Sequence, residues 1–335
     1  MEKKLKSKIK LVLKLAFVCG LLFFLAKNGF ISMQHTGEAF GRWDKMVPAF
    51  LGLAVTLVLG VTRWQILLRA QNIQLSWGKI FQIALIGNFF NIALPGAVSG
   101  DFVKAFYIGN EIQGKRAWAF GTILFDRVAG LSALVILSAG ALTLGLKNFY
   151  GTSLYSAIHL FVVVAAICVL SFFAYLFLVR EHHDPVLRIL RAAEKKFVKL
   201  GSFARIYEGL RAFHNHRLAV IATLLLSVLI HLIVGWIFLT FAEALGDVNL
   251  SLLSVYVVFP LGLLIVAIPV APAGIGTGHA GYSFLFGLIG SQRGADVFTL
   301  FALANMIFGG IGGLIYLQFK AKSPKLDLSH ATENS

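Results

Sequence analysis

The chain has 335 residues, of which 58% are hydrophobic and 13% are charged, and its mean hydropathy is +0.82. A soluble globular domain is far less apolar, so this composition predicts an all-α polytopic integral membrane protein. We expect one transmembrane domain over residues 1–325 and a disordered tail over 326–335. The two cysteines, Cys19 and Cys168, lie inside apolar runs, which argues against a disulfide framework or a cysteine metal site.

The net charge of +15 is unevenly distributed along the chain. Most of the 30 Lys and Arg lie in the segments that connect the apolar runs on one side, which the positive-inside rule makes the cytoplasmic side. Both termini are then cytoplasmic, and the basic segments are suited to an anionic lipid leaflet. Nucleic acid is not an expected partner, because no basic domain is present to bind it.

The first two predicted spans are residues 11–26 and 47–68. Five lysines before the first run resemble the start of a signal peptide, but no small-residue cleavage site follows, so we expect an uncleaved helix. The second span returns the chain to the cytoplasm.

Residues 80–110 are too long for one span and too short for two, and Pro95-Gly96 interrupts them near the middle. Basic residues flank this segment on both sides. The pattern predicts a re-entrant hairpin that enters from the cytoplasm and returns to it.

Two further spans are predicted at 117–146, which carries Asp126-Arg127, and at 154–179. They complete a first half of about residues 1–180. Residues 181–217 are basic, with apolar residues at helical spacing, which predicts an amphipathic helix on the cytoplasmic membrane surface. The histidines of this segment do not share a helix face, so solvated side chains are favoured over a metal site.

The second half, residues 218–320, contains spans at 218–242 and 295–319. Lysines after residue 319 place the end of the last span inside, so residues 251–292 begin and end outside. Pro and Gly interrupt this segment at 269–278. The prediction is a helical bundle with about six full spans and two re-entrant broken-helix hairpins.

The two hairpins carry similar motifs. Residues 96–101 read Gly-Ala-Val-Ser-Gly-Asp, and residues 274–279 read Gly-Ile-Gly-Thr-Gly-His. Asp126 follows the first motif and Asn305 follows the second at nearly the same spacing. The match of motif, spacing and opposite entry side predicts an inverted repeat.

Irregular backbone inside a membrane is tolerated only where protein or a water-filled cavity surrounds it. Two breaks from opposite sides should therefore meet near the midplane, with helix N-termini that favour anions. We expect Gly100 and Gly278 to approach each other across one cavity. Gly-x-x-x-Gly spacing is also explained by helix packing alone. A dinucleotide site at 274–278 is excluded by the lack of a βαβ unit, so no cofactor is expected.

Asp126 and Arg127 lie within an apolar run, where each charge costs about 2.5–3.5 kcal/mol at the bilayer centre. Adjacent side chains point about 100° apart on a helix, so each needs another partner. Asp101 is the expected partner of Arg127, and Lys104, one turn away, is expected to share it. The alternatives are a structural ion-pair network and a phosphate site centred on Arg127. In the second, His279 and Asp101 serve as proton-linked or gating groups.

Residues 88–104, Asp126-Arg127 and residues 269–276 resemble the lysyl-phosphatidylglycerol synthase transmembrane-region family. That family is the flippase half of bacterial multiple-peptide-resistance proteins and also occurs as stand-alone membrane proteins of bacteria and archaea. The resemblance implies a flippase-like domain in a bacterial or archaeal cytoplasmic (inner) membrane. His279 stands where the family often has an acid, and no Arg lies near Met306, where the family often has one.

The leading hypothesis is therefore a transporter that binds or moves a phospholipid or polyprenyl-phosphate lipid through a midplane cavity, without enzymatic activity, cofactor or metal. One alternative is a membrane-embedded lipid-carrier-dependent transferase, and another is a scaffold for a separately encoded lipid-modifying enzyme. The oligomeric state is left open. The candidate substrate-binding residues are Asn88, Asn91, Pro95, Gly96, Ser99, Gly100, Asp101, Lys104, Asp126, Arg127, Pro272, Gly274, Gly276, Thr277, Gly278, His279 and Asn305.

Overall fold

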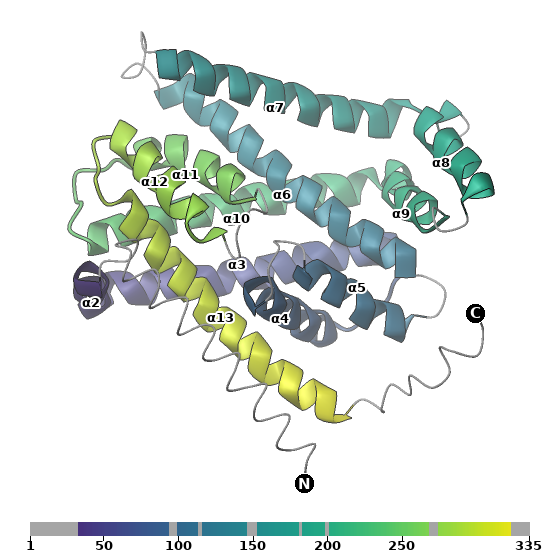
Figure 1. Ribbon diagram of the computed structural model, residues 1–335, viewed down its shortest axis with the longest axis horizontal. Helices are drawn as coiled ribbons and strands as arrows, with labels where there is room; N and C mark the ends of the chain where they lie inside the picture. Colours follow the sequence, from purple (N-terminus) through teal and green to yellow (C-terminus); the bar gives the residue numbers. More distant parts are fainter. Residues whose placement is uncertain are drawn as a thin grey trace.

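The computed structural model describes residues 33–93, 99–112, 116–145, 153–180, 183–197, 201–267 and 274–322, and these ranges fold entirely into helices and short connections (Figure 1). The predicted span at 11–26 and the predicted tail lie outside them. The helices are α2 (Met33–Gly41), α3 (Trp43–Ala70), α4 (Trp77–Ala93), α5 (Ser99–Glu111), α6 (Arg116–Gly145), α7 (Ser153–Leu178), α8 (Pro185–Lys196), α9 (Gly201–Arg211), the 3-10 helix η4 (Ala212–Asn215), α10 (Arg217–Ala244), α11 (Leu252–Ala267), α12 (Thr277–Leu288) and α13 (Gly294–Lys322).

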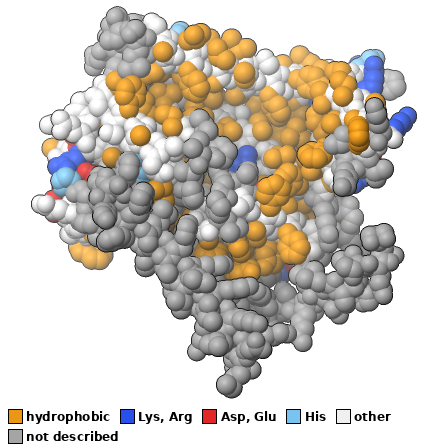
Figure 2. Space-filling model, viewed as in Figure 1, with side chains coloured by type: hydrophobic (Ala, Val, Ile, Leu, Met, Phe, Trp, Pro, Cys, Tyr) orange, Lys and Arg blue, Asp and Glu red, His pale blue; other side chains and the backbone are white. Residues whose placement is uncertain are grey.

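Five of these helices, α3, α6, α7, α10 and α13, are long and apolar enough to cross a membrane. They coincide with the predicted spans other than 11–26, which confirms a polytopic all-α protein. Large apolar side chains are exposed along α7, for example Leu160, Leu170 and Leu178. Hydrophobic side chains also cover much of the face shown in Figure 2, as expected of a surface that contacts lipid chains.

Helices α4 and α5 form the first predicted hairpin and pack side by side. The ion pair between Lys79 Nζ and Glu111 Oε1, at 2.8 Å, joins the start of α4 to the end of α5. The chain therefore enters and leaves this hairpin at the same end. A Cβ at Gly100 would lie 2.0 Å from the carbonyl oxygen of Gly87, so only glycine allows this approach of the two helices. The interruption at 94–98 lies outside the described residues.

Helices α11 and α12 form the second hairpin. The Tyr282 hydroxyl donates to the carbonyl oxygen of Phe259 at 2.9 Å, and its ring lies where a Cβ at Gly262 would be. Gly274 and Gly276 have φ of +69° and +90°, a region that disfavours other residues, and they lead the chain into α12. The preceding residues 268–273 are not among those described.

The helices of the two halves pack in a reciprocal pattern. Helices α3 and α10 lie antiparallel against each other, since Lys45 pairs with Glu243 near one end and Arg63 reaches Ser227 near the other. Helix α4 packs on α13 and α11 packs on α6, whereas α5 packs on α6 and α12 on α13. The first arm of each hairpin thus lies on the long helix of the other half. This exchange supports the predicted inverted repeat.

The structure corrects the prediction of one amphipathic helix at 181–217. The segment contains two antiparallel helices, α8 and α9, joined by Arg191–Glu208 at 3.1 Å and Arg205–Glu194 at 3.8 Å. The single helix was predicted because α8 and α9 are both amphipathic, so apolar residues recur at helical spacing in each of them. Helix α9 also packs tightly on α6, where a Cβ at Gly121 would lie 3.2 Å from the backbone of Gly209.

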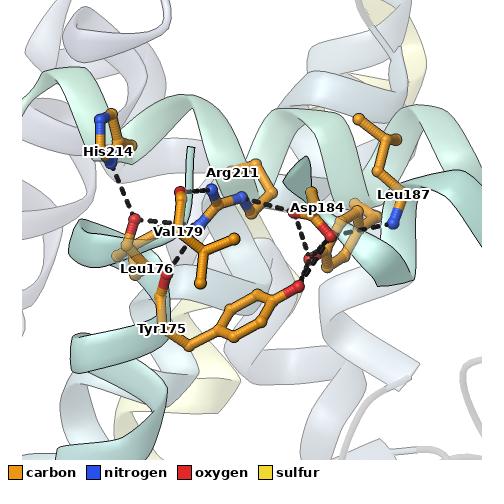
Figure 3. Close-up of polar contacts among 8 residues, drawn as sticks. Tyr175, Leu176, Val179, Asp184, Leu187, Arg211 and His214 are labelled. Carbon is orange, nitrogen blue, oxygen red and sulfur yellow. Dashed lines mark hydrogen bonds and ion pairs between the residues drawn. The ribbon is translucent and has the colours of Figure 1, made fainter. Parts of the chain in front are cut away.

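A buried ion pair joins the end of α9 to Asp184, the N-cap of α8, and Arg211 also reaches the end of α7 (Figure 3). Arg211 Nε lies 2.8 Å from Asp184 Oδ2, and Arg211 also donates to the carbonyl oxygen of Leu176 at 2.9 Å. Burial alone would raise the pKa of the Asp184 carboxyl, but hydrogen bonds from Leu187 N, Tyr175 and Tyr207, together with the charge of Arg211, lower it. We call Asp184, Arg211, Tyr175 and Tyr207 the Asp184–Arg211 node. Sequence reasoning did not find it.

Candidate functional site

The charges of α6 have separate partners. Asp126 forms a two-pronged ion pair with Arg63 of α3, with Nε–Oδ1 at 2.7 Å and Nη2–Oδ2 at 2.9 Å. The remaining nitrogen of Arg63 donates to Ser227 Oγ of α10 at 2.8 Å. Both side chains are largely buried. This closed network joins three spans. For Asp126 it favours a role in a structural ion-pair network over a role in a phosphate site.

Arg63 is a residue that sequence reasoning missed. The sequence does contain a feature that points to Arg63, because it is a lone charge inside the predicted span 47–68. A charge within a span needs a partner, but the sequence does not say which acid provides it.

Arg127 pairs with Asp101 of the first hairpin, as predicted, with Nε–Oδ2 at 2.8 Å. Lys104 Nζ lies 3.5 Å from the other carboxylate oxygen, which confirms the expected sharing. The side chain of Asp101 is only 3% exposed, whereas that of Arg127 is 46% exposed. The pair thus has a buried acid and an accessible guanidinium.

Lys104 is held on several sides. Its alkyl chain crosses Gly87, where a Cβ would lie 2.5 Å from Cε. Its ammonium lies 5.5 Å from the ring centroid of Trp64, and Trp64 Nε1 in turn donates to Thr122 Oγ1 at 3.2 Å. Lys104 is therefore a positioned counter-charge for Asp101.

The start of α5 is capped from α4. Gly100 N donates to Asn91 Oδ1 at 2.8 Å, and Ser99 Oγ donates to the carbonyl oxygen of Phe90 at 3.1 Å. The backbone of Asn88 lies at the contact of α4 with α13, near Gly309. Asn91 and Ser99 therefore fix Asp101 in place through the hairpin. Pro95 and Gly96, which were predicted to line the site, lie outside the described residues.

The predicted residues of the second hairpin make contacts within their own half. His279 is buried, with Nδ1 accepting from Gly276 N at 3.3 Å and Nε2 lying 3.1 Å from Thr299 Oγ1. Thr277 Oγ1 donates to the carbonyl oxygen of Gly274 at 3.2 Å. These bonds describe a histidine that caps the start of α12. Its role as a proton-linked or gating group stays a prediction, and Pro272 is outside the described ranges.

Two other expectations concern contacts across the site. A Cβ at Gly278 would lie 2.3 Å from the ring of Phe298, and that at Gly100 would meet α4, so each glycine packs closely inside its own half. The approach of Gly100 to Gly278 stays a prediction. Asn305 is exposed and donates to the carbonyl oxygen of Phe301 at 2.8 Å, within its own helix.

The charge balance of the cluster favours an anion. Its five charged side chains are Arg63, Asp101, Lys104, Asp126 and Arg127. Three are cations and two are anions, so one positive charge is in excess, and Arg127 is the most exposed of them. No group of three or more metal-ligating side chains was found within the described part of the chain.

Comparisons with known proteins agree with this membrane architecture. A family model described as "Lysylphosphatidylglycerol synthase TM region" matches residues 11–319. A UPF0104 membrane protein of Methanothermobacter thermautotrophicus is 26% identical over 259 residues, which cover 72% of this chain and 75% of that protein. Another, from Pyrococcus horikoshii, is 24% identical over 309 residues, 84% of this chain and 89% of its own length.

A phosphatidylglycerol lysyltransferase of Staphylococcus aureus is 29% identical over 147 residues. These residues are 41% of this chain but only 18% of the lysyltransferase. No solved structure matches the chain significantly.

Proposed function

The chain belongs to the lysylphosphatidylglycerol synthase transmembrane-region family, and from this premise we propose that it is a lipid transporter. The proposed substrate is a phospholipid or polyprenyl-phosphate lipid, bound by its phosphate and moved across the membrane through the region of the first hairpin. The family and the similarity to a phosphatidylglycerol lysyltransferase support a lipid as the partner.

The observation that carries the proposal is the exposure of Arg127. Its side chain lies within a candidate membrane span, yet 46% of it is accessible. A charged side chain at this depth costs about 2.5–3.5 kcal/mol unless water or an opposite charge meets it. The planar donor fork of a guanidinium binds a phosphate through two parallel hydrogen bonds. A lipid phosphate therefore suits this position.

Asp101 and Lys104 provide the charge partners that the proposed site needs before and after lipid binding. In the structure, Arg127 is paired with Asp101 at 2.8 Å. In the proposed cycle, the phosphate binds the exposed guanidinium of Arg127 and is balanced by the excess positive charge of the cluster. Lys104 then keeps Asp101 paired, since it already lies 3.5 Å from that carboxylate. Release of the lipid restores the starting pair.

Reconstitution into liposomes tests the proposal. Fluorescent phosphatidylglycerol and a short-chain polyprenyl phosphate are placed in one leaflet, and their movement is followed by quenching from outside. We expect transport by the wild type, loss in Arg127→Ala, and partial activity in Arg127→Lys, which keeps the charge but lacks the fork. Arg188→Ala, which removes an exposed cation from α8, is the matched control and should move lipid normally. Equal transport by Arg127→Ala and wild type would refute the role of Arg127.

The similarity to a phosphatidylglycerol lysyltransferase favours a second candidate function. In this alternative the chain is a membrane scaffold for a separately encoded lipid-modifying enzyme. Purification from the native membrane separates the two functions. A soluble lipid-modifying enzyme that co-purifies in fixed ratio, together with no lipid movement by the chain alone, would favour the scaffold.

A further inference from the structure

We propose that a hollow between the end of α3 and the start of α10 binds the phosphate of an anionic phospholipid of the cytoplasmic leaflet, apart from the Arg127 cluster. The hollow has a volume of about 680 Å³. This size falls in the usual range of small-ligand sites. Its lining comprises Ile66, Arg69, Ala70, His214, Asn215, His216, Arg217, Leu218 and Ala219.

The charge of the lining selects an anion. It contains two arginines and no acidic residue. The side chain of Arg69 is exposed and makes no hydrogen bond or ion pair with the described residues. The guanidinium of Arg217 is positioned by a cation–π contact, with its Cζ 5.8 Å from the ring centroid of Phe177. This contact leaves the N–H donors of Arg217 available. Two uncommitted guanidiniums facing one hollow suit a phosphate.

The backbone adds to this preference. Helix α10 is 28 residues long and begins at Arg217, beside the hollow. Its N-cap residue, His216, makes no capping hydrogen bond through its side chain. The first N–H groups of α10 thus point toward this end with the positive end of the helix dipole, which favours an anion.

The wall of the hollow is held in place by the Asp184–Arg211 node. Arg211 directly precedes η4 and is buried against Asp184 and the end of α7. His214 of η4 is fixed through its Nδ1, which lies 2.9 Å from the carbonyl oxygen of Leu176 (Figure 3). Its other ring nitrogen points away from Leu176. The site therefore exists before any lipid arrives, which lowers the entropy cost of binding.

An apolar track leads from the hollow along α10, and this identifies the ligand as a lipid. Leu218 is 83% exposed at the rim, and Ile221, Leu225 and Leu229 continue one exposed face of the helix at spacings of three and four residues. A phosphate at Arg69 and Arg217 would place its acyl chains along this face. Free phosphate would make no use of it.

Photo-crosslinking in nanodiscs tests the assignment with the full chain. Phosphatidylglycerol with a diazirine in its acyl chain is activated, and labelled peptides are mapped by mass spectrometry. We expect labelling of the Leu218–Leu225 region in the wild type. In Arg69→Gln/Arg217→Gln the labelling should fall about 25-fold, near fivefold for each lost cation. Arg180→Gln/Arg188→Gln removes two other cytoplasmic cations and should label normally.

Competition experiments and a second variant distinguish a lipid site from a free-anion site and from diffuse surface charge. Unlabelled phosphatidylglycerol should compete better than phosphatidylcholine, whereas competition by millimolar inorganic phosphate alone would show a free-anion site and overturn the lipid assignment. Arg69→Lys/Arg217→Lys keeps the charge in case the glutamine pair does not fold, and it should label between the two extremes. Equal losses in both glutamine pairs would mean diffuse surface charge and would also overturn the proposal. Arg127→Ala should label normally here, so this result is independent of the transport proposal.

Discussion

At the scale of single residues, the described charges inside the spans divide into a closed pair and an open one. Arg63 and Asp126 satisfy each other and reach Ser227, whereas Arg127 keeps an accessible side chain beside the buried Asp101. The first arrangement is expected to contribute stability and the second to bind a ligand. Separate variants of the two arginines should therefore affect different measurements.

Arg63→Gln should destabilise the protein strongly. It leaves the buried Asp126 without its two-pronged partner, and loss of one member of a buried ion pair costs about 3–5 kcal/mol. Thermal unfolding in detergent measures the effect. The double variant Arg63→Gln/Asp126→Asn should recover part of the loss, because no buried charge is then left alone. A double variant as unstable as the single one would contradict this account.

Asp184→Asn should destabilise the protein at neutral pH and remove part of its acid sensitivity. The pKa of Asp184 is lower in the folded protein, so its contribution is complete above the unfolded value of about 3.9 and is lost as pH falls through the folded pKa. The wild type should therefore lose stability relative to the variant below about pH 4. Melting temperatures measured between neutral and acidic pH check this, and a constant difference would refute it.

The sequence could reveal Asp101, Lys104, Asp126 and Arg127, but not the partner of Asp126 or the Asp184–Arg211 node. Asp101, Lys104 and Arg127 were found because they lie in apolar segments at interpretable spacings. Arg63 was visible as a lone charge, but nothing local links it to an acid 63 positions away in the chain. Asp184 and Arg211 lie in a basic polar segment, where solvated side chains are the ordinary expectation.

At the scale of elements, hydropathy found the described long helices because a span is a simple length requirement. The hairpins were found from their interruptions. Helix α2 was missed because it is only 9 residues long and no apolar run marks it. The division of α8 from α9 was missed because both helices are amphipathic, and because the packing of α9 on α6 joins segments far apart in the sequence.

Gly100→Ala should destabilise the first hairpin. The added methyl group would meet the carbonyl oxygen of Gly87 at 2.0 Å, which forces α5 away from α4. Gly60→Ala and Gly140→Ala are matched controls inside helices, since nothing lies within 4 Å of their Cβ positions. These controls should be neutral or more stable by about 0.5–1 kcal/mol. Thermal unfolding that ranks Gly100→Ala with the controls would refute the packing argument.

At the scale of the whole molecule, the fold makes a prediction about sidedness. The turn between α3 and α4 and the turn between α10 and α11 should lie on opposite sides of the membrane. In a variant without Cys19 and Cys168, Val248→Cys should react with an impermeant maleimide in intact cells, whereas Gln74→Cys should react only after permeabilisation. Both positions are exposed, so reactivity depends on side alone. The same pattern at both positions would contradict the topology.

The exchange of first hairpin arms also limits how the molecule can move. Because α4 lies on α13 and α11 lies on α6, the two halves are interlocked and cannot swing apart as rigid bodies without breaking both contacts. The second arms, α5 and α12, are anchored on the long helix of their own half. We therefore expect an opening that leaves these contacts intact to displace α5 or α12. If α5 is the helix that moves, spin labels should report changing α5–α6 distances during the proposed lipid transport while the α4–α13 distance stays constant.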